Sequence, residues 1–195
     1  MLGFIHITKT GGTDIKDKNK NKEIIYGGYH NENAEFYKKK GMKCFAIIRE
    51  PVERYCSLFY YNSHGSDKYK KHFKDMNIND FVNHHYIDKS IANFEGGTQF
   101  RTQVSWLKNA DENETFIISY HKTRLIDSIC EFCKSINIDF IYENVNKINQ
   151  THYKNYNALT EESIKKIKEM YAEDCLLYEK FITVNAPFCK LSQIT

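Results

Sequence analysis

The first thirteen residues restrict the fold more than any other segment. The apolar run Phe4–Thr8 continues directly into Lys9-Thr10-Gly11-Gly12-Thr13. An apolar run that ends in glycines and hydroxyl residues predicts a buried strand, a loop and then a helix. Glycines let backbone N–H groups converge on phosphate oxygens, while the helix N-terminus and the lysine add positive charge. We therefore expect a P-loop-like phosphate-binding loop after the first strand. Its spacing differs from that of nucleoside triphosphatases, in which the lysine follows the glycines.

A second segment has the same strand-then-polar organisation. The apolar run Lys43–Ile48 is followed by Arg49-Glu50-Pro51. Proline suits the first position of a helix, so the strand should end near Arg49 and a helix should begin near Val52. This places Arg49 at the carboxyl end of a strand and Ser57 about two turns into the helix. We expect these two side chains to share one anion.

Together the two segments resemble the PAPS-dependent sulfotransferases, in particular the branch with the heparan sulfate 2-O- and 6-O-sulfotransferases. The match is residue for residue at Lys9–Thr13 and at Arg49, Pro51, Arg54 and Ser57. The resemblance implies that Lys9, Thr10, Gly11, Gly12 and Thr13 hold the 5′-phosphosulfate of PAPS (3′-phosphoadenosine 5′-phosphosulfate). It implies that Arg49 and Ser57 hold the 3′-phosphate. The expected reaction transfers a sulfuryl group to a hydroxyl acceptor and releases PAP. The expected acceptor is a carbohydrate. No metal is needed, because the lysine and the helix dipole supply the positive charge.

The candidate general base lies between the two segments. Gly28-Tyr29-His30 resembles the segment where the 6-O branch carries its catalytic histidine. A neutral imidazole can accept a hydroxyl proton near pH 7. Glu23 is the rival, because other branches use a glutamate. His6 is expected inside the first strand, a poor place for a base. The expected catalytic residues are therefore Lys9 and His30.

The rest of the chain predicts an α/β fold. Short apolar runs alternate with helical patterns, which favours three layers with a mainly parallel sheet flanked by helices. A chain of 195 residues with 41% hydrophobic content can bury one core, so a single sulfotransferase domain over 1–195 is expected. Such sheets bind ligands outside the carboxyl ends of their strands, where Lys9, His30 and Arg49 should fall. Three further elements are expected: a strand over Thr115–Tyr120, a helix carrying Leu125, Ile129, Phe132 and Ile136, and a helix over Thr160–Phe181.

Composition limits the partners and the compartment. The net charge of +3 is too small to imply nucleic-acid binding. No stretch approaches the ~20 apolar residues of a membrane span, and no signal peptide is evident. As the chain stands we expect a cytoplasmic protein, and the Golgi lumen only if an upstream anchor has been removed. The six cysteines fit reduced thiols better than disulfides. Nothing in the sequence indicates an oligomeric state.

Two other functions stay open at this stage. One is an ATP-dependent small-molecule kinase with a degenerate phosphate loop, which PAP binding without ATP binding would exclude. The other is a non-catalytic nucleotide-binding protein of the same fold, since fold does not fix function. The basic runs Lys38–Lys40 and Lys68–Lys74 are interpreted as solvated faces. The alternative is attraction of an anionic glycan acceptor.

Overall fold

The computed structural model of the chain describes residues 1–13, 15, 24–26, 32–65, 73, 76–92, 99–120, 124–140 and 158–195. The chain divides into two compact units. Unit 1 comprises Met1–Arg49, Gln103–Ile148 and Leu176–Thr195, and unit 2 comprises Glu50–Thr102 and Asn149–Cys175. The single domain over 1–195 stays a prediction, because compactness does not tell whether either unit folds without the other.

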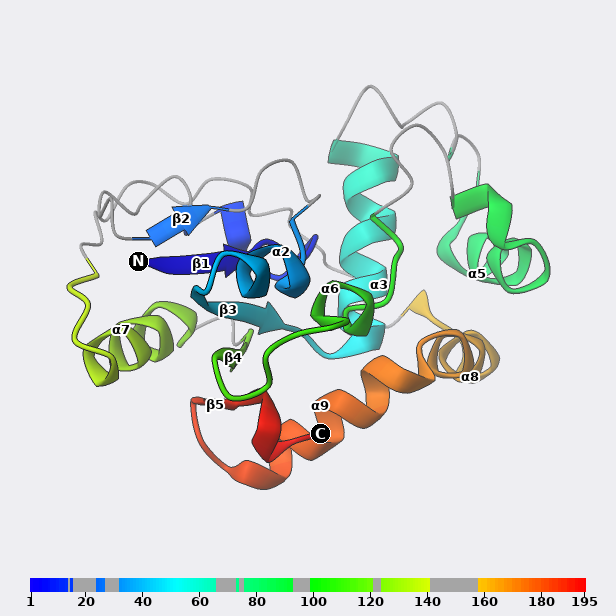
Figure 1. Cartoon of the computed structure of the whole chain (residues 1–195). Helices are drawn as coiled ribbons and strands as arrows, with labels where there is room; N and C mark the ends of the chain where they lie inside the picture. Colours follow the sequence, from blue (N-terminus) through cyan, green and yellow to red (C-terminus); the bar gives the residue numbers. More distant parts are fainter. Residues whose placement is uncertain are drawn as a thin grey trace. The chain divides into compact units, whose positions relative to one another are not determined.

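Unit 1 contains a five-stranded sheet with the strand order β2-β1-β3-β4-β5 (Figure 1). β1 is parallel to β2 and β3, β3 is parallel to β4, and β5 is antiparallel to β4. The apolar runs at the start, centre and later part of the chain form β1, β3 and β4, as predicted. The strands are β1 (Leu2–Ile5), β2 (Ile24–Tyr26), β3 (Lys43–Ile48), β4 (Thr115–Ser119) and β5 (Phe188–Lys190).

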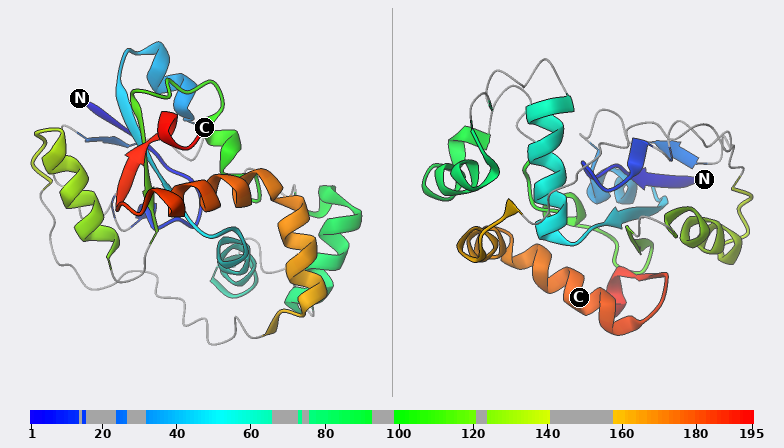
Figure 2. Two further views of the ribbon diagram at one scale, coloured as in Figure 1. Left: turned by 90° about the horizontal axis from the view of Figure 1, so that it is seen from below. Right: turned by 180° about the vertical axis from the view of Figure 1, so that it is seen from behind.

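Helices cover both faces of this sheet, with α7 on one side and α2, α6 and α9 on the other (Figure 2). Along β3, Cys44, Ala46 and Ile48 face one cluster while Phe45 and Ile47 face the other, because side chains of a strand alternate. The α/β class with a mainly parallel sheet is therefore confirmed. The helices are α2 (Ala34–Lys39), α6 (Val104–Leu107), α7 (Leu125–Ser135), α9 (Ala172–Val184, in unit 1 from Leu176 onward) and the short η4 (Leu191–Gln193).

Unit 2 is helical and packs around aromatic rings. Its helix α3 begins at Pro51, one residue before the predicted start near Val52, and the Glu50 side chain accepts a hydrogen bond from the Glu53 N–H at 2.6 Å. The helices are α3 (Pro51–Tyr60), η1 (Tyr61–Gly65), α5 (Ile78–Ile87), η2 (Lys89–Ala92) and α8 (Glu161–Met170). The core rings are those of Tyr55, Phe59, Phe73, Phe81, Phe100 and Tyr171.

The helix predicted over Thr160–Phe181 is wrong in one respect, because it breaks into α8 and α9 at Tyr171. The Tyr171 backbone leaves helical geometry, with φ −117° and ψ 34°. Its ring is buried, and its hydroxyl donates to the Phe100 carbonyl oxygen at 2.6 Å. This contact within unit 2 accompanies the break.

All six cysteines are free thiols, four of them buried. Burial raises the pKa of the Cys44 thiol to about 11 and that of Cys133 to about 12, so both stay protonated near neutral pH. Cys130 and Cys133, three positions apart in the sequence, both lie within helix α7. Within the described residues, no helix has the length and apolar character needed to cross a membrane.

Candidate functional site

The two predicted phosphate-binding segments meet at one edge of the sheet in unit 1. β1 ends at Ile5 and β3 at Ile48, and the two strands are parallel neighbours. The segments that follow them therefore leave the sheet at the same carboxyl edge. Nη1 of Arg49 donates to the Lys9 carbonyl oxygen at 3.3 Å. Arg49 and the Lys9 loop are thus in direct contact, although 40 positions separate them in the chain.

The loop after β1 turns sharply. Lys9 has φ 61° and Gly11 has φ 90°, both in the left-handed region. A lysine there stores backbone strain on the order of 1–3 kcal/mol, so its surroundings must hold it. The Thr10 hydroxyl donates to the Ile7 carbonyl oxygen at 2.9 Å and is fully buried, so this side chain closes the turn. Left-handed residues in a loop can aim successive N–H groups at one anion.

A side chain at either glycine of the loop would displace a neighbouring side chain. A Cβ at Gly11 would lie 2.7 Å from Cδ2 of Leu125 and 3.0 Å from Cε2 of Tyr120. A Cβ at Gly12 would overlap the His6 ring. The chain is helical at Gly12 and Thr13, and Thr13 is exposed. The glycines therefore let a loop, the start of α7 and the end of β4 pack together.

The expectation that His6 lies inside the first strand is wrong. β1 ends at Ile5, and His6 follows it. The His6 ring is half-buried, packs against Gly12 and is stacked on Phe4 with ring centroids 5.5 Å apart. The strand ends three residues before the apolar run Phe4–Thr8 does, so the histidine borders the glycine loop.

Arg49 is held at its backbone and at its guanidinium. Its backbone N–H donates to Oε1 of Gln103, and its carbonyl oxygen accepts from Nε2 of Gln103, both at 2.8 Å. The guanidinium carbon lies over the Tyr120 ring, 4.6 Å from its centroid. The Arg49 side chain is 8% exposed. Because Arg49 is buried, the cation–π contact and the two hydrogen bonds to the Gln103 amide fix it against the Lys9 loop.

Ser57 lies in unit 2, on α3, and is buried. Its sharing of an anion with Arg49 stays a prediction. Arg54, on the same helix as Ser57, is also buried. It lies 4.0 Å from the Asp174 carboxylate and donates to the Gln99 carbonyl oxygen at 3.0 Å. Arg54 is therefore part of the core of unit 2.

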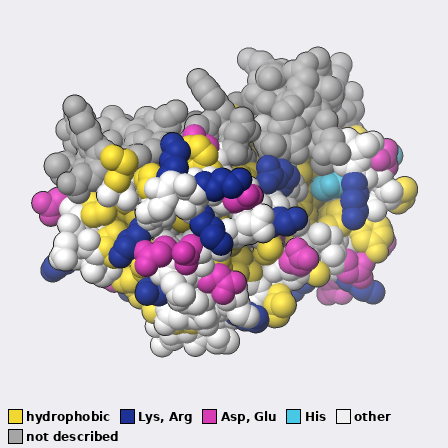
Figure 3. All heavy atoms as spheres, viewed as in Figure 1, with side chains coloured by type: hydrophobic (Ala, Val, Ile, Leu, Met, Phe, Trp, Pro, Cys, Tyr) yellow, Lys and Arg dark blue, Asp and Glu magenta, His cyan; other side chains and the backbone are white. Residues whose placement is uncertain are grey.

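Several predicted residues fall outside the described ones. His30 and Glu23, the two candidate bases, are among them, as are Gly28 and the basic stretch Lys68–Lys71. Among the described lysines of the other basic run, Lys39 pairs with Glu35 at 2.8 Å, and Lys40 lies over the Phe36 ring. Figure 3 shows Lys and Arg side chains interspersed with Asp and Glu on the face it presents. Both findings favour a solvated face for Lys38–Lys40.

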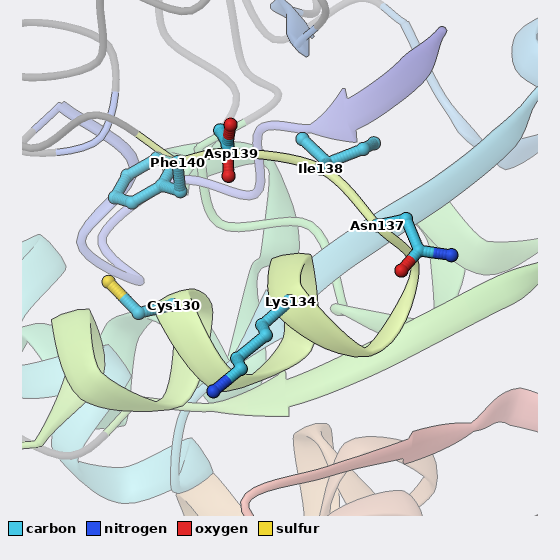
Figure 4. A pocket seen from close by; sticks show the side chains of 6 residues that line it. All are labelled: Cys130, Lys134, Asn137, Ile138, Asp139 and Phe140. Atoms are coloured by element: carbon cyan, nitrogen blue, oxygen red, sulfur yellow. The ribbon is translucent and has the colours of Figure 1, made fainter.

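A pocket of about 470 Å³ in unit 1 lies away from these residues, between α7 and the segment that follows it (Figure 4). The Lys134 amine and the Asp139 carboxylate point away from each other in this view. Such divergent side chains do not converge on a ligand, so we place the candidate site at the Lys9 loop. The described lining residues are Cys130, Lys134, Asn137, Ile138, Asp139 and Phe140.

Two residues of the site were not predicted to contact Arg49. Tyr120 directly follows β4, and its N–H donates to the Ile48 carbonyl oxygen at 2.6 Å. The rule that ligands bind beyond the carboxyl ends of parallel strands could have indicated it. Gln103 carries no such signal, because it precedes the short helix α6 rather than following a strand.

Comparison with protein-family models, with curated proteins and with solved structures finds no match. The sulfotransferase resemblance therefore depends on the residues of the two segments alone.

Proposed function

We propose that the chain is a PAPS-dependent sulfotransferase that transfers a sulfuryl group to a hydroxyl of a carbohydrate. The observation that carries the proposal is the contact between Arg49 and the Lys9 loop. Two segments that match separate phosphate-binding motifs in sequence meet at the carboxyl edge of a parallel sheet. This edge is where open α/β sheets bind their ligands.

The proposed chemistry is an in-line displacement. The acceptor oxygen forms a bond to sulfur as the bond from sulfur to the 5′-phosphate oxygen breaks, and PAP leaves. The acceptor proton passes to His30. Lys9 neutralises the charge that develops on the 5′-phosphate, and the N–H groups of Gly11 and Gly12 hold that phosphate still. Arg49 and Ser57 hold the 3′-phosphate, and the loop's positive charge makes a metal ion unnecessary.

Sulfuryl transfer from PAPS to a panel of sugar hydroxyls, followed by mass spectrometry, tests the proposal. Lys9→Ala should lower kcat by roughly 10²–10³, the scale of a lost oxyanion donor, and weaken PAP binding less. Lys39→Ala is the matched control, because that lysine is exposed and paired with Glu35. Wild-type kcat in Lys9→Ala would show that this lysine takes no part in transfer.

A second pair of variants separates the candidate bases. His30→Ala should still bind PAP, because the base acts on the acceptor, while turnover falls by roughly 10²–10⁴. Glu23→Gln should remain active. The reverse result would assign the base role to the glutamate.

The same assays distinguish the two competing functions. Binding of ATP with magnesium in preference to PAP would indicate a kinase. Tight PAP binding without turnover on any acceptor would indicate a non-catalytic binder.

A further inference from the structure

The Gln103 side chain continues the sheet by one position beyond the end of β3. A primary amide carries one acceptor and one donor group, as a peptide bond does, and Gln103 uses both on Arg49 at 2.8 Å. From the end of the neighbouring strand β4, the Tyr120 N–H donates a hydrogen bond to the Ile48 carbonyl oxygen. Arg49 is therefore held as if it were still inside a strand, although β3 has ended.

Gln103 is itself fixed in place. Its side chain is fully buried, and its carbonyl oxygen accepts a hydrogen bond from the Trp106 N–H at 3.1 Å. Trp106 is fully buried in the same core cluster as Ile48, the last residue of β3. The amide thus reaches Arg49 from a rigid support, which a site needs if its geometry is to be precise.

We propose that Gln103 is a positioning residue, which holds the Arg49 backbone so that the guanidinium lies between the Tyr120 ring and the Lys9 carbonyl. This inference rests on the proposed function, because it assigns Gln103 to recognition of the 3′-phosphate through Arg49. Without the Gln103 amide, the Arg49 backbone loses both hydrogen bonds. The backbone position from which the guanidinium side chain extends is then no longer fixed. A displacement of about 1 Å at such a group is enough to lose binding geometry.

The decisive comparison uses PAP and AMP, which differ only in the 3′-phosphate. Gln103→Met keeps the side-chain length and removes both hydrogen bonds. Titration calorimetry should show PAP binding weakened roughly 10- to 100-fold, equivalent to one lost charge-assisted bond, with AMP binding nearly unchanged. Thr115→Val is the matched control. It removes a buried contact to Cys44 (3.4 Å) near the opposite end of β3 and should leave PAP and AMP binding unchanged.

Equal weakening of PAP and AMP, or an unchanged preference for PAP, would overturn the positioning role. If Gln103→Met does not fold, Gln103→Asn decides by the same readout, because its shorter amide cannot span both backbone groups.

Hydrogen exchange of the Arg49 amide separates this inference from the proposed function. Exchange should accelerate in Gln103→Met while the Ala46 amide, inside the β3 ladder, stays protected. If wild type does not prefer PAP over AMP, the assignment to the 3′-phosphate fails with the proposed function. Accelerated exchange would then still support Gln103 as the group that positions Arg49, and unchanged exchange would refute that as well.

Discussion

Units 1 and 2 each bury an arginine of the same Arg-x-Pro-x-x-Arg pattern, but they surround it differently. Arg54 in unit 2 is 1% exposed and faces the fully buried carboxylate of Asp174. Arg49 in unit 1 is 8% exposed, donates to a carbonyl oxygen and lies over a tyrosine ring. A charge in a core is tolerated when an opposite charge accompanies it. Burial alone therefore does not distinguish the two arginines, but their surroundings do, because Arg49 lies at a sheet edge beside a glycine loop.

Two buried tyrosines of unit 2 also have polar partners inside its core. The Tyr55 hydroxyl lies 2.9 Å from Nδ1 of His85, and the Tyr171 hydroxyl donates to the Phe100 carbonyl oxygen. Burial lowers the pKa of His85 to about 4 and raises the pKa of both tyrosines above their usual range. In unit 2 these polar groups bond within the core, whereas in unit 1 Arg49 lies at an edge of the sheet.

The largest effect should come from breaking the buried pair in unit 2. Arg54→Met leaves the Asp174 carboxylate buried without its cation, which typically costs about 3–5 kcal/mol. Urea denaturation should show this loss in the free energy of unfolding. The double variant Arg54→Met/Asp174→Leu should recover most of it, because no charge then remains buried. A single variant as stable as wild type would contradict the contrast between the two arginines.

Arg49→Ala should affect binding more than stability. Losing charge-assisted hydrogen bonds worth roughly 1.5–3 kcal/mol each should erase most of the preference for PAP over AMP. Titration calorimetry measures the preference, and urea denaturation measures stability. Arg49→Lys is the control that keeps the charge but not the planar fork, and we expect intermediate binding. Equal PAP and AMP affinities in the wild type would refute the assignment of Arg49.

His85 should make unit 2 sensitive to acid. Its pKa falls from 6.5 to about 4 on folding, chiefly by burial and secondarily through Lys89. The unfolded chain therefore binds this proton more readily, and stability present above pH 6.5 is lost as the pH falls towards 4. The loss should reach roughly 2 kcal/mol at pH 5.

Urea denaturation from pH 7 to 4.5 measures this slope. His85→Gln should flatten it, and His84→Gln, an exposed neighbour on α5, should not. An unchanged slope in His85→Gln would show that other groups control acid stability.

The strands of unit 1 were largely predictable because buried parallel strands appear as continuous apolar runs. β3 and β4 are such runs. The antiparallel strand β5 has three residues, too few to show a period. The break at Tyr171 was not predictable either, because the apolar spacing continues through it and the tertiary contact to Phe100 is not encoded locally.

The candidate site was also predictable only in part. The strand rule placed Lys9 and Arg49 at one edge, and their contact in unit 1 agrees with it. The bond from Gln103 to Arg49 joins positions 54 residues apart, and it depends on how α6 packs against β3. Spacing within one segment carries no information about such a contact.

The smallest expected effect concerns the Tyr120 ring under Arg49. A cation–π contact of this kind contributes about 0.5–1 kcal/mol, so Tyr120→Leu should weaken PAP binding roughly two- to fivefold. Tyr120→Phe keeps the ring and should bind PAP like the wild type. Calorimetry on both variants, with AMP as the reference ligand, tests the contact. If Phe and Leu weaken PAP binding equally, the hydroxyl rather than the ring holds Arg49. If neither weakens it, Gln103 and the Lys9 carbonyl suffice to position the arginine, and the edge of unit 1 depends on hydrogen bonds alone.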